Sequence, residues 1–143
     1  MTTVAVDHRT GVAASDSKCT IGAIWVTSTK IHRHKDELIG TAGTDAQCQR
    51  WLEWYRAGKK GAPPKFDQAE ALVLRKDGVF YVEDGGSEFK VERGFHAIGS
   101  GAAAAMAVML AGHSAEEAVR IAIQVDAQSG GEVQVFHLKG PDG

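Results

Sequence analysis

Short runs of apolar and β-branched residues, separated by turn residues, dominate the first third of the chain. Runs of this length with glycine, aspartate or serine between them are typical of strands. The strands expected here are Thr3–Val6, Gly11–Ala14, Ile21–Val26, Lys30–Arg33 and Glu37–Ala42. A polar turn at Asp7–Thr10 joins the first two, so Asp16, just beyond the second, should return beside Thr2.

A helical pattern follows these strands, and Thr44 or Asp45 can cap its N-terminus. Apolar side chains then recur with the spacing of one helix face, which predicts a stripe that faces the core. The stripe comprises Cys48, Trp51, Leu52 and Tyr55. Gly58 is expected to end the helix. The segment Gly58–Pro64 is too rich in glycine and proline for regular structure and predicts a loop.

Apolar runs return in the second half of the chain. The first two flank Lys76-Asp77-Gly78, and an Asp-Gly pair in this setting predicts a hairpin. A further turn at Asp84–Ser87 leads into the next run. The strands expected in this half are Glu70–Arg75, Val79–Val82, Phe89–Val91, Phe95–Ile98 and Val133–Leu138, before the polar tail Lys139–Gly143.

Two helices are expected before the last strand. Gly99–Gly101 opens an alanine- and methionine-rich helix through Leu110, and its small residues predict close packing between layers. Ser114 and Glu117 form a capping box for the second helix, which Asp126–Gly131 ends. The apolar face expected on this helix comprises Ala118, Ile121, Ala122 and Val125.

The order of the elements predicts the fold class. Strand hairpins that are segregated from helices favour an α+β fold over a parallel α/β sheet. The 143 residues suit a single domain, 1–143, with its own core.

Composition argues against several classes of function. A net charge of −2 gives no basic face for nucleic acid, and no apolar run approaches the ~20 residues that cross a membrane. Because no secretory signal is present, Cys19 and Cys48 are expected to be reduced thiols in a cytoplasmic protein. His32 and His34 suit a solvated strand face; with no third ligand nearby, no metal site is expected.

The glycine-rich step Gly99–Gly101 could bind an anion at a helix N-terminus. It lacks the third glycine of a dinucleotide-binding loop and the Gly-Lys-Ser/Thr of a P-loop. It also lacks the full Gly-x-Ser-x-Gly of a serine hydrolase. We therefore expect no cofactor, and a serine nucleophile at Ser100 is disfavoured.

Candidate catalytic residues lie at the start of the chain, where Thr2 and Thr3 follow Met1. A small second residue is the usual condition for removal of the initiator methionine. Removal would place the Thr2 hydroxyl beside its own free amine, which is a known pairing of nucleophile and base. An α-amino group titrates near pH ~8 and can act as a base at neutral pH. Taken alone, the two threonines are more often ordinary strand residues.

Several short motifs together carry a resemblance. They are Thr2–Val6, Gly11–Asp16, Ser28–Ile31, Gly40–Ala46, Ala97–Gly101 and Asp126–Gly131. In this order they resemble the proteasome β-subunit family, which includes the bacterial HslV peptidase, within the N-terminal nucleophile hydrolases. The resemblance touches most of the chain, and its Asp-x-x-Ser-Gly-Gly stretch is closer to the proteasome form. It implies a four-layer αββα sandwich. The second helix that the family has after the first is missing here, so one helical layer is reduced.

The resemblance also implies roles for individual residues. Thr2, freed by loss of Met1 alone, is the nucleophile, and its amine is the general base. Lys30 lowers the proton affinity of the threonine hydroxyl, and Asp16 holds that lysine charged and in place. The N–H of Gly43 donates to the oxyanion.

Three further residues, Ser100, Asp126 and Ser129, resemble those that hydrogen-bond around the N-terminal amine. The implied function is a threonine-type peptidase that cleaves peptides or unfolded proteins as a homo-oligomer, with an ATPase unfoldase as a possible partner. Two alternatives stay open. One is a non-catalytic scaffold or assembly protein that keeps the fold, and the other is a small-molecule amidohydrolase of the same superfamily.

Overall fold

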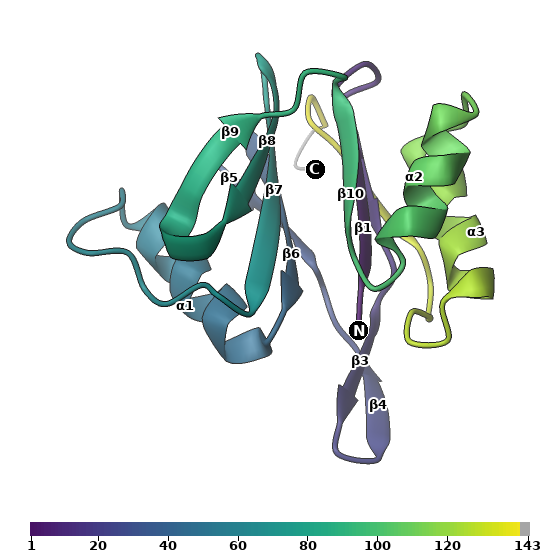
Figure 1. Cartoon of the computed structure of the whole chain (residues 1–143), viewed down its shortest axis with the longest axis horizontal. Helices are drawn as coiled ribbons and strands as arrows, with labels where there is room; N and C mark the ends of the chain where they lie inside the picture. Colours follow the sequence, from purple (N-terminus) through teal and green to yellow (C-terminus); the bar gives the residue numbers. More distant parts are fainter. Residues whose placement is uncertain (141–143) are drawn as a thin grey trace.

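The computed structural model describes residues 1–140 and has an α+β fold, as the order of elements predicts (Figure 1). Its helices are α1 (Asp45–Arg56), α2 (Ala102–Leu110), α3 (Ala115–Val125) and a short 3₁₀ turn, η1 (Asp84–Gly86). Its strands are β1 (Thr3–Asp7), β2 (Val12–Ser15), β3 (Lys18–Ile21), β4 (Ile24–Thr27), β5 (Ile31–His34), β6 (Glu37–Gly43), β7 (Ala69–Arg75), β8 (Gly78–Glu83), β9 (Ser87–Lys90), β10 (Phe95–Gly99) and β11 (Gln134–His137).

Two antiparallel sheets form the centre of the molecule. One has the order β10-β1-β2-β11 and the other the order β5-β6-β7-β8-β9. Alternation along β1 shows how they pack, because Val4 and Val6 face the second sheet while Ala5 faces the helices. The core between the sheets also contains Leu38, Leu72, Leu74, Val79 and Ile98.

Helices cover the outer face of each sheet (Figure 1). Helices α2 and α3 lie against the first sheet, where Ala5 and Ala14 allow close approach. On the second sheet, α1 buries Trp51, Leu52 and Tyr55, as the apolar stripe predicts. Cys48, the fourth member of the expected stripe, is half-buried.

The ends of α1 and α3 agree with the predicted start and stop signals, with one exception. Gly58 follows the last turn of α1 with φ of 88°, as a C-terminal glycine should. Thr44 occupies the N-cap position of α1 without making a side-chain cap hydrogen bond. The capping box of α3 is confirmed, since Ser114 and Glu117 cap each other's backbone N–H groups.

One predicted strand is wrong. The stretch Ile21–Val26 is a hairpin of β3 and β4, because Gly22, with φ of 64°, starts a two-residue turn between paired Ile21 and Ile24. Figure 1 shows this hairpin projecting from the two main sheets. Its apolar residues Ile21, Ile24 and Trp25 are exposed, so this apolar run does not mark a buried strand. The second predicted hairpin is confirmed, although its turn residues are Lys76 and Asp77, with Gly78 paired to Arg75.

The expected packing of α2 and α3 needs correction. Helix α2 lies in the outer layer rather than between layers: Ala105 and Met109 are buried, while Leu110 is exposed. A helix that is apolar on all sides gives no phase from which to choose the buried face. On α3, Ile121 and Val125 are exposed. The buried stripe is Ala115, Ala118, Val119 and Ala122.

The segment between α1 and β7 contains no helix, which confirms the expectation that no second helix follows α1. In the described part of the chain, no helix is both long and apolar enough to span a bilayer. The expected polar tail is described only to Gly140, and its last three residues lie outside the described part of the chain.

The capping box yields a stability prediction. Replacing Ser114 by Ala removes the acceptor for the Glu117 N–H and should lower the free energy of unfolding by about 1 kcal/mol. Urea unfolding monitored by circular dichroism measures this change. Ser87→Ala, at an exposed serine, is the control and should change it by less than ~0.5 kcal/mol. Equal effects of the two substitutions would contradict the cap's contribution.

Candidate active site

Thr2 lies at one end of the first sheet, directly before the inner strand β1. It is half-buried, whereas the next residue, Thr3, is fully buried. Strand β1 is held on one side by β10 and on the other by β2. Because Thr2 precedes a strand with a partner on each side, its backbone has a defined position.

A buried ion pair lies beside this position. The Lys30 ammonium, on a residue only 7 % exposed, donates to Asp16 Oδ1 at 2.9 Å and to the carbonyl of Lys18 at 2.6 Å. A third bond, at 2.8 Å, goes to the carbonyl of Met1. The ammonium therefore reaches the peptide bond that joins Met1 to Thr2.

Asp16 is completely buried and is satisfied by several donors. Its Oδ1 also accepts the Thr3 N–H at 3.0 Å, and its Oδ2 accepts the Gly130 N–H at 3.0 Å. Each charge-assisted bond offsets part of the cost of burying the carboxylate. Asp16 thereby joins the start of β1 to Lys30 and to the loop after α3.

Hydroxyl groups form a second network around Asp126. Ser100 and Ser129 both donate to Asp126 Oδ2, at 2.5 Å and 2.6 Å. Since the Ser129 proton is used in that bond, the Thr3 hydroxyl must donate to Ser129 Oγ at 2.7 Å. The Thr2 N–H donates to Ser100 Oγ at 3.3 Å. The three residues expected near the amine are thus brought together beside Thr2.

The charge state of Asp126 follows from these bonds. Burial alone would raise its pKa, but the hydroxyls of Ser100 and Ser129 and the N–H of Gln128 outweigh that effect. Its pKa therefore lies below the ordinary value for aspartate. The network is anionic at neutral pH and lies beside the Thr2 nitrogen.

Two pockets open on either side of Thr2, and Gly43 lines both. One, of about 270 Å³, lies over β7 and includes Glu70 and Tyr81. The other, of about 220 Å³, lies toward β3 and α1. Gly43 has φ of 122°, and a Cβ there would overlap the backbone of the strand beside it, so only glycine fits.

Cys19 and Cys48 both line the smaller pocket, and Cys48 is a competing nucleophile in this region. Burial raises the pKa of its thiol to about 11. A thiol with this pKa is almost entirely protonated at neutral pH, so it is a poor nucleophile. Cys19 and Cys48 are both free thiols in the described structure.

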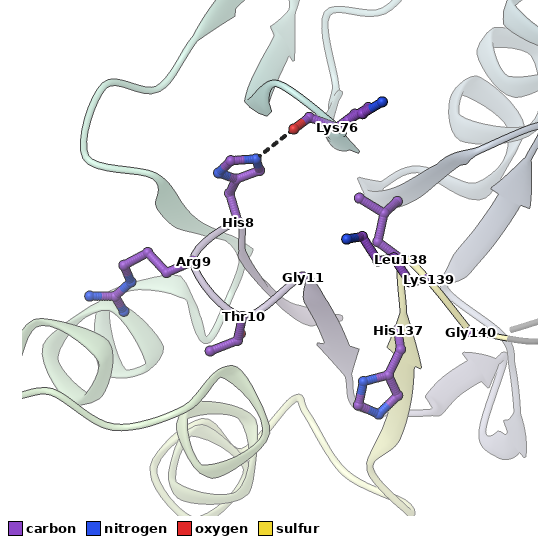
Figure 2. Close-up of a pocket in the computed structure, with 9 residues that line it drawn as sticks. All are labelled: His8, Arg9, Thr10, Gly11, Lys76, His137, Leu138, Lys139 and Gly140. Atoms are coloured by element: carbon purple, nitrogen blue, oxygen red, sulfur yellow. Dashed lines mark hydrogen bonds between the residues drawn. The ribbon is translucent and has the colours of Figure 1, made fainter.

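A larger cavity, of about 750 Å³, lies at the opposite end of β1 (Figure 2). Its walls come from the turn after β1, from Lys76, and from the end of β11 with the segment that follows it. Two of its basic residues are already engaged, since His8 donates to the carbonyl of Lys76 at 2.9 Å and Arg9 is bound by Asp7. We therefore place the candidate site at Thr2, where a buried ion pair, a hydroxyl network and two pockets coincide.

Two residues at Thr2 were not predicted from the sequence. Glu70 accepts the Gly99 N–H at 3.0 Å and the Tyr81 hydroxyl at 2.8 Å. The signal lay in the alternation of β7, where Leu72 and Leu74 face the core between the sheets. A charged residue in the same phase as these leucines indicates a polar group with a specific partner.

Comparison with solved structures gives the fold. The chain matches HslV from Trypanosoma brucei with a TM-score of 0.69 and 22% identity, covering 94% of this chain and 99% of that one. It also matches BPH from Thiobacillus denitrificans, with a TM-score of 0.71 and 22% identity over 98% of this chain and 100% of BPH. BPH in complex with epoxomicin matches with a TM-score of 0.65 and 18% identity, over 96% of this chain and 100% of that one.

No family model and no curated protein matches the sequence. At these identities the structural matches establish the fold, which is of the HslV and proteasome β type. The resemblance seen in the short motifs is confirmed at this level.

The buried pair yields a second stability prediction. Lys30→Met leaves the buried Asp16 without its counter-charge and should lower the free energy of unfolding by ~3–5 kcal/mol. Adding Asp16→Asn should recover part of this loss, because the uncompensated charge is then gone. Urea unfolding measures both changes.

The matched control is an exposed ion pair of similar length. Arg120 contacts Glu116 at 2.6 Å, with both side chains about half exposed. Arg120→Met should cost less than ~1 kcal/mol. A Lys30→Met loss no larger than this would show that the buried pair contributes little to stability.

Proposed function

We propose that the chain is a threonine-type peptidase whose nucleophile is the hydroxyl of Thr2 after removal of Met1. One observation carries the proposal: the buried Lys30 ammonium reaches the peptide bond directly before Thr2. A buried, paired cation at the one position where a terminal hydroxyl and amine can be exposed is the arrangement that nucleophilic catalysis needs.

The proposed reaction begins at the Thr2 amine. The amine accepts the hydroxyl proton, and Oγ1 attacks the carbonyl carbon of the substrate peptide bond. The resulting oxyanion accepts the N–H of Gly43. The C–N bond then breaks, the leaving amine takes the proton, and water hydrolyses the ester on Thr2 to release the acyl product and restore the hydroxyl.

Lys30 is proposed to stabilise the reacting oxygen. Its ammonium donates to three acceptors, and loss of Met1 removes one of them. The freed donor can then turn to Thr2 Oγ1, whose developing negative charge it stabilises. Asp16 keeps the ammonium in place.

The serine and aspartate network is proposed to orient the amine. The short bond from Ser100 to Asp126, 2.5 Å, uses the hydroxyl proton, so Ser100 Oγ accepts from the Thr2 nitrogen. That bond directs the amine, while its lone pair remains free to accept the hydroxyl proton. Ser129 joins the same carboxylate to the hydroxyl of Thr3.

The fold comparisons support this proposal. They include BPH in complex with epoxomicin and HslV. We propose further that residues 1–143 form one domain with the four-layer sandwich of N-terminal nucleophile hydrolases. In this arrangement, α1 alone forms one helical layer. Peptides or unfolded chains are the proposed substrates, in a homo-oligomer that an ATPase unfoldase could serve.

A non-catalytic scaffold is the second candidate function. The contacts that Met1 makes favour it if Met1 is not removed. The Met1 amine donates to the carbonyl of Gln128 at 3.2 Å, and its own carbonyl holds Lys30. While Met1 stays, no free Thr2 amine exists. The two candidates therefore differ in the state of the N-terminus.

Mass spectrometry after incubation with epoxomicin, a peptide epoxyketone, tests the proposed function. The Met1-free chain should form a stable adduct on Thr2, while the Met1-retaining chain and a Met1-free Thr2→Ala variant should form none. Absence of an adduct on the Met1-free chain would sink the peptidase proposal.

The anionic network also predicts a pH effect. Activity should rise with pH through the pKa of the amine, near ~8, because the base must be unprotonated. The charge of Asp126 favours a protonated amine and so raises that pKa. Asp126→Asn should therefore shift the acid limb of the pH–kcat/KM profile to lower pH, as peptide hydrolysis measures. An unchanged limb, or a shift to higher pH, would contradict this electrostatic role.

A further inference from the structure

The turn Gly99–Gly101 wraps around the backbone of Thr2. The Gly101 N–H donates to the carbonyl of Thr2 at 3.3 Å, and the Thr2 N–H donates to Ser100 Oγ at 3.3 Å. A Cβ on Gly99 would overlap the Thr2 carbonyl oxygen. The turn is therefore in direct contact with Thr2, so a change in the position of the turn would change the position of Thr2.

Glu70 holds this turn from the opposite sheet. One carboxylate oxygen accepts the Gly99 N–H at 3.0 Å, and the other accepts the Tyr81 hydroxyl at 2.8 Å. Glu70 and Tyr81 belong to β7 and β8, whereas Gly99 ends β10. The contact thus joins the two sheets at the edge where Thr2 lies, and both side chains line the 270 Å³ pocket beside it.

The ring of Tyr81 packs against two other rings. Its centroid lies 5.7 Å from that of His96, in an edge-on arrangement, and 5.6 Å from that of Phe89. Burial raises the pKa of the Tyr81 hydroxyl, and the bond to Glu70 raises it further. The hydroxyl therefore keeps its proton at neutral pH and remains a donor to Glu70.

We propose that Glu70, braced by Tyr81, is a positioning residue for Thr2. Glu70 acts through the Gly99 N–H and so sets the position of the turn that contacts Thr2. This inference rests on the proposed function, because it assigns Glu70 a part in the reaction of Thr2. A displacement of about 1 Å in a reacting group is enough to slow a reaction ~10²-fold.

The test compares the reaction of epoxomicin with Met1-free variants at Glu70. In Glu70→Ala, the maximal rate constant of adduct formation should fall ~10- to ~100-fold, while the half-saturating concentration of epoxomicin changes less than ~2-fold. Glu70→Gln keeps an oxygen for the Gly99 N–H and should restore the rate to within ~3-fold of the parent. Amide hydrogen exchange at Gly101 should become faster in Glu70→Ala only.

A matched control is Glu37, which begins β6 at the end remote from Gly43. Glu37 accepts the Tyr55 hydroxyl at 2.6 Å and also binds Arg75, so Glu37→Ala also breaks a tyrosine–glutamate pair, here between the same sheet and α1. It should leave the rate of adduct formation unchanged, whatever its effect on stability.

The outcomes separate the two proposals. A parent chain that forms no adduct overturns the proposed function, and with it the role of Glu70. A reactive parent with an equally reactive Glu70→Ala variant overturns the role of Glu70 alone. Equal losses in Glu70→Ala and Glu37→Ala would show a general effect on folding. No rescue by Glu70→Gln would show that an acceptor for the Gly99 N–H is not what the reaction needs. Either result would also overturn the role of Glu70.

Discussion

The arrangement at Thr2 depends on the buried contact between Asp16 and Lys30. Moving two charges out of water costs several kcal/mol per ion, and the structure offsets this cost with further hydrogen bonds to both side chains. The bonds to Asp16 come from the start of β1, from Lys30 before β5 and from the loop after α3. Because these segments are distant in sequence, the carboxylate is neutralised only when both sheets and that loop are assembled.

Much of the fold and of the site could be predicted from the sequence, for identifiable reasons. Short apolar and β-branched runs predicted β1 and β6 closely, and the stripe of Trp51, Leu52 and Tyr55 predicted the buried face of α1. The residues expected around Thr2 were recognised as ordered motifs, and the structure brings Asp16, Lys30, Ser100, Asp126 and Ser129 to it. Their proposed catalytic roles remain predictions, as does that of Gly43.

The errors share a physical origin, which is that they depend on contacts between distant segments. A short apolar run looks the same in the sequence whether it is buried or, as at Trp25, exposed on a projecting hairpin. The uniformly apolar α2 has no polar face to indicate which side meets the sheet. Glu70 was missed because its partners, Gly99 and Tyr81, lie on other strands. Only its phase along β7 indicated that its side chain points inward.

Met1 explains how one cleavage could change the site twice. Its carbonyl occupies one donor of the Lys30 ammonium, and its peptide bond ties up the Thr2 nitrogen as an amide, which is not a base. Removing Met1 would convert that nitrogen into an amine and would free the ammonium donor in the same step. Base and cation then become available together, beside one hydroxyl. In the proposed mechanism, an intact N-terminus would keep the site inactive although Asp16, Ser100 and Asp126 already lie beside Thr2.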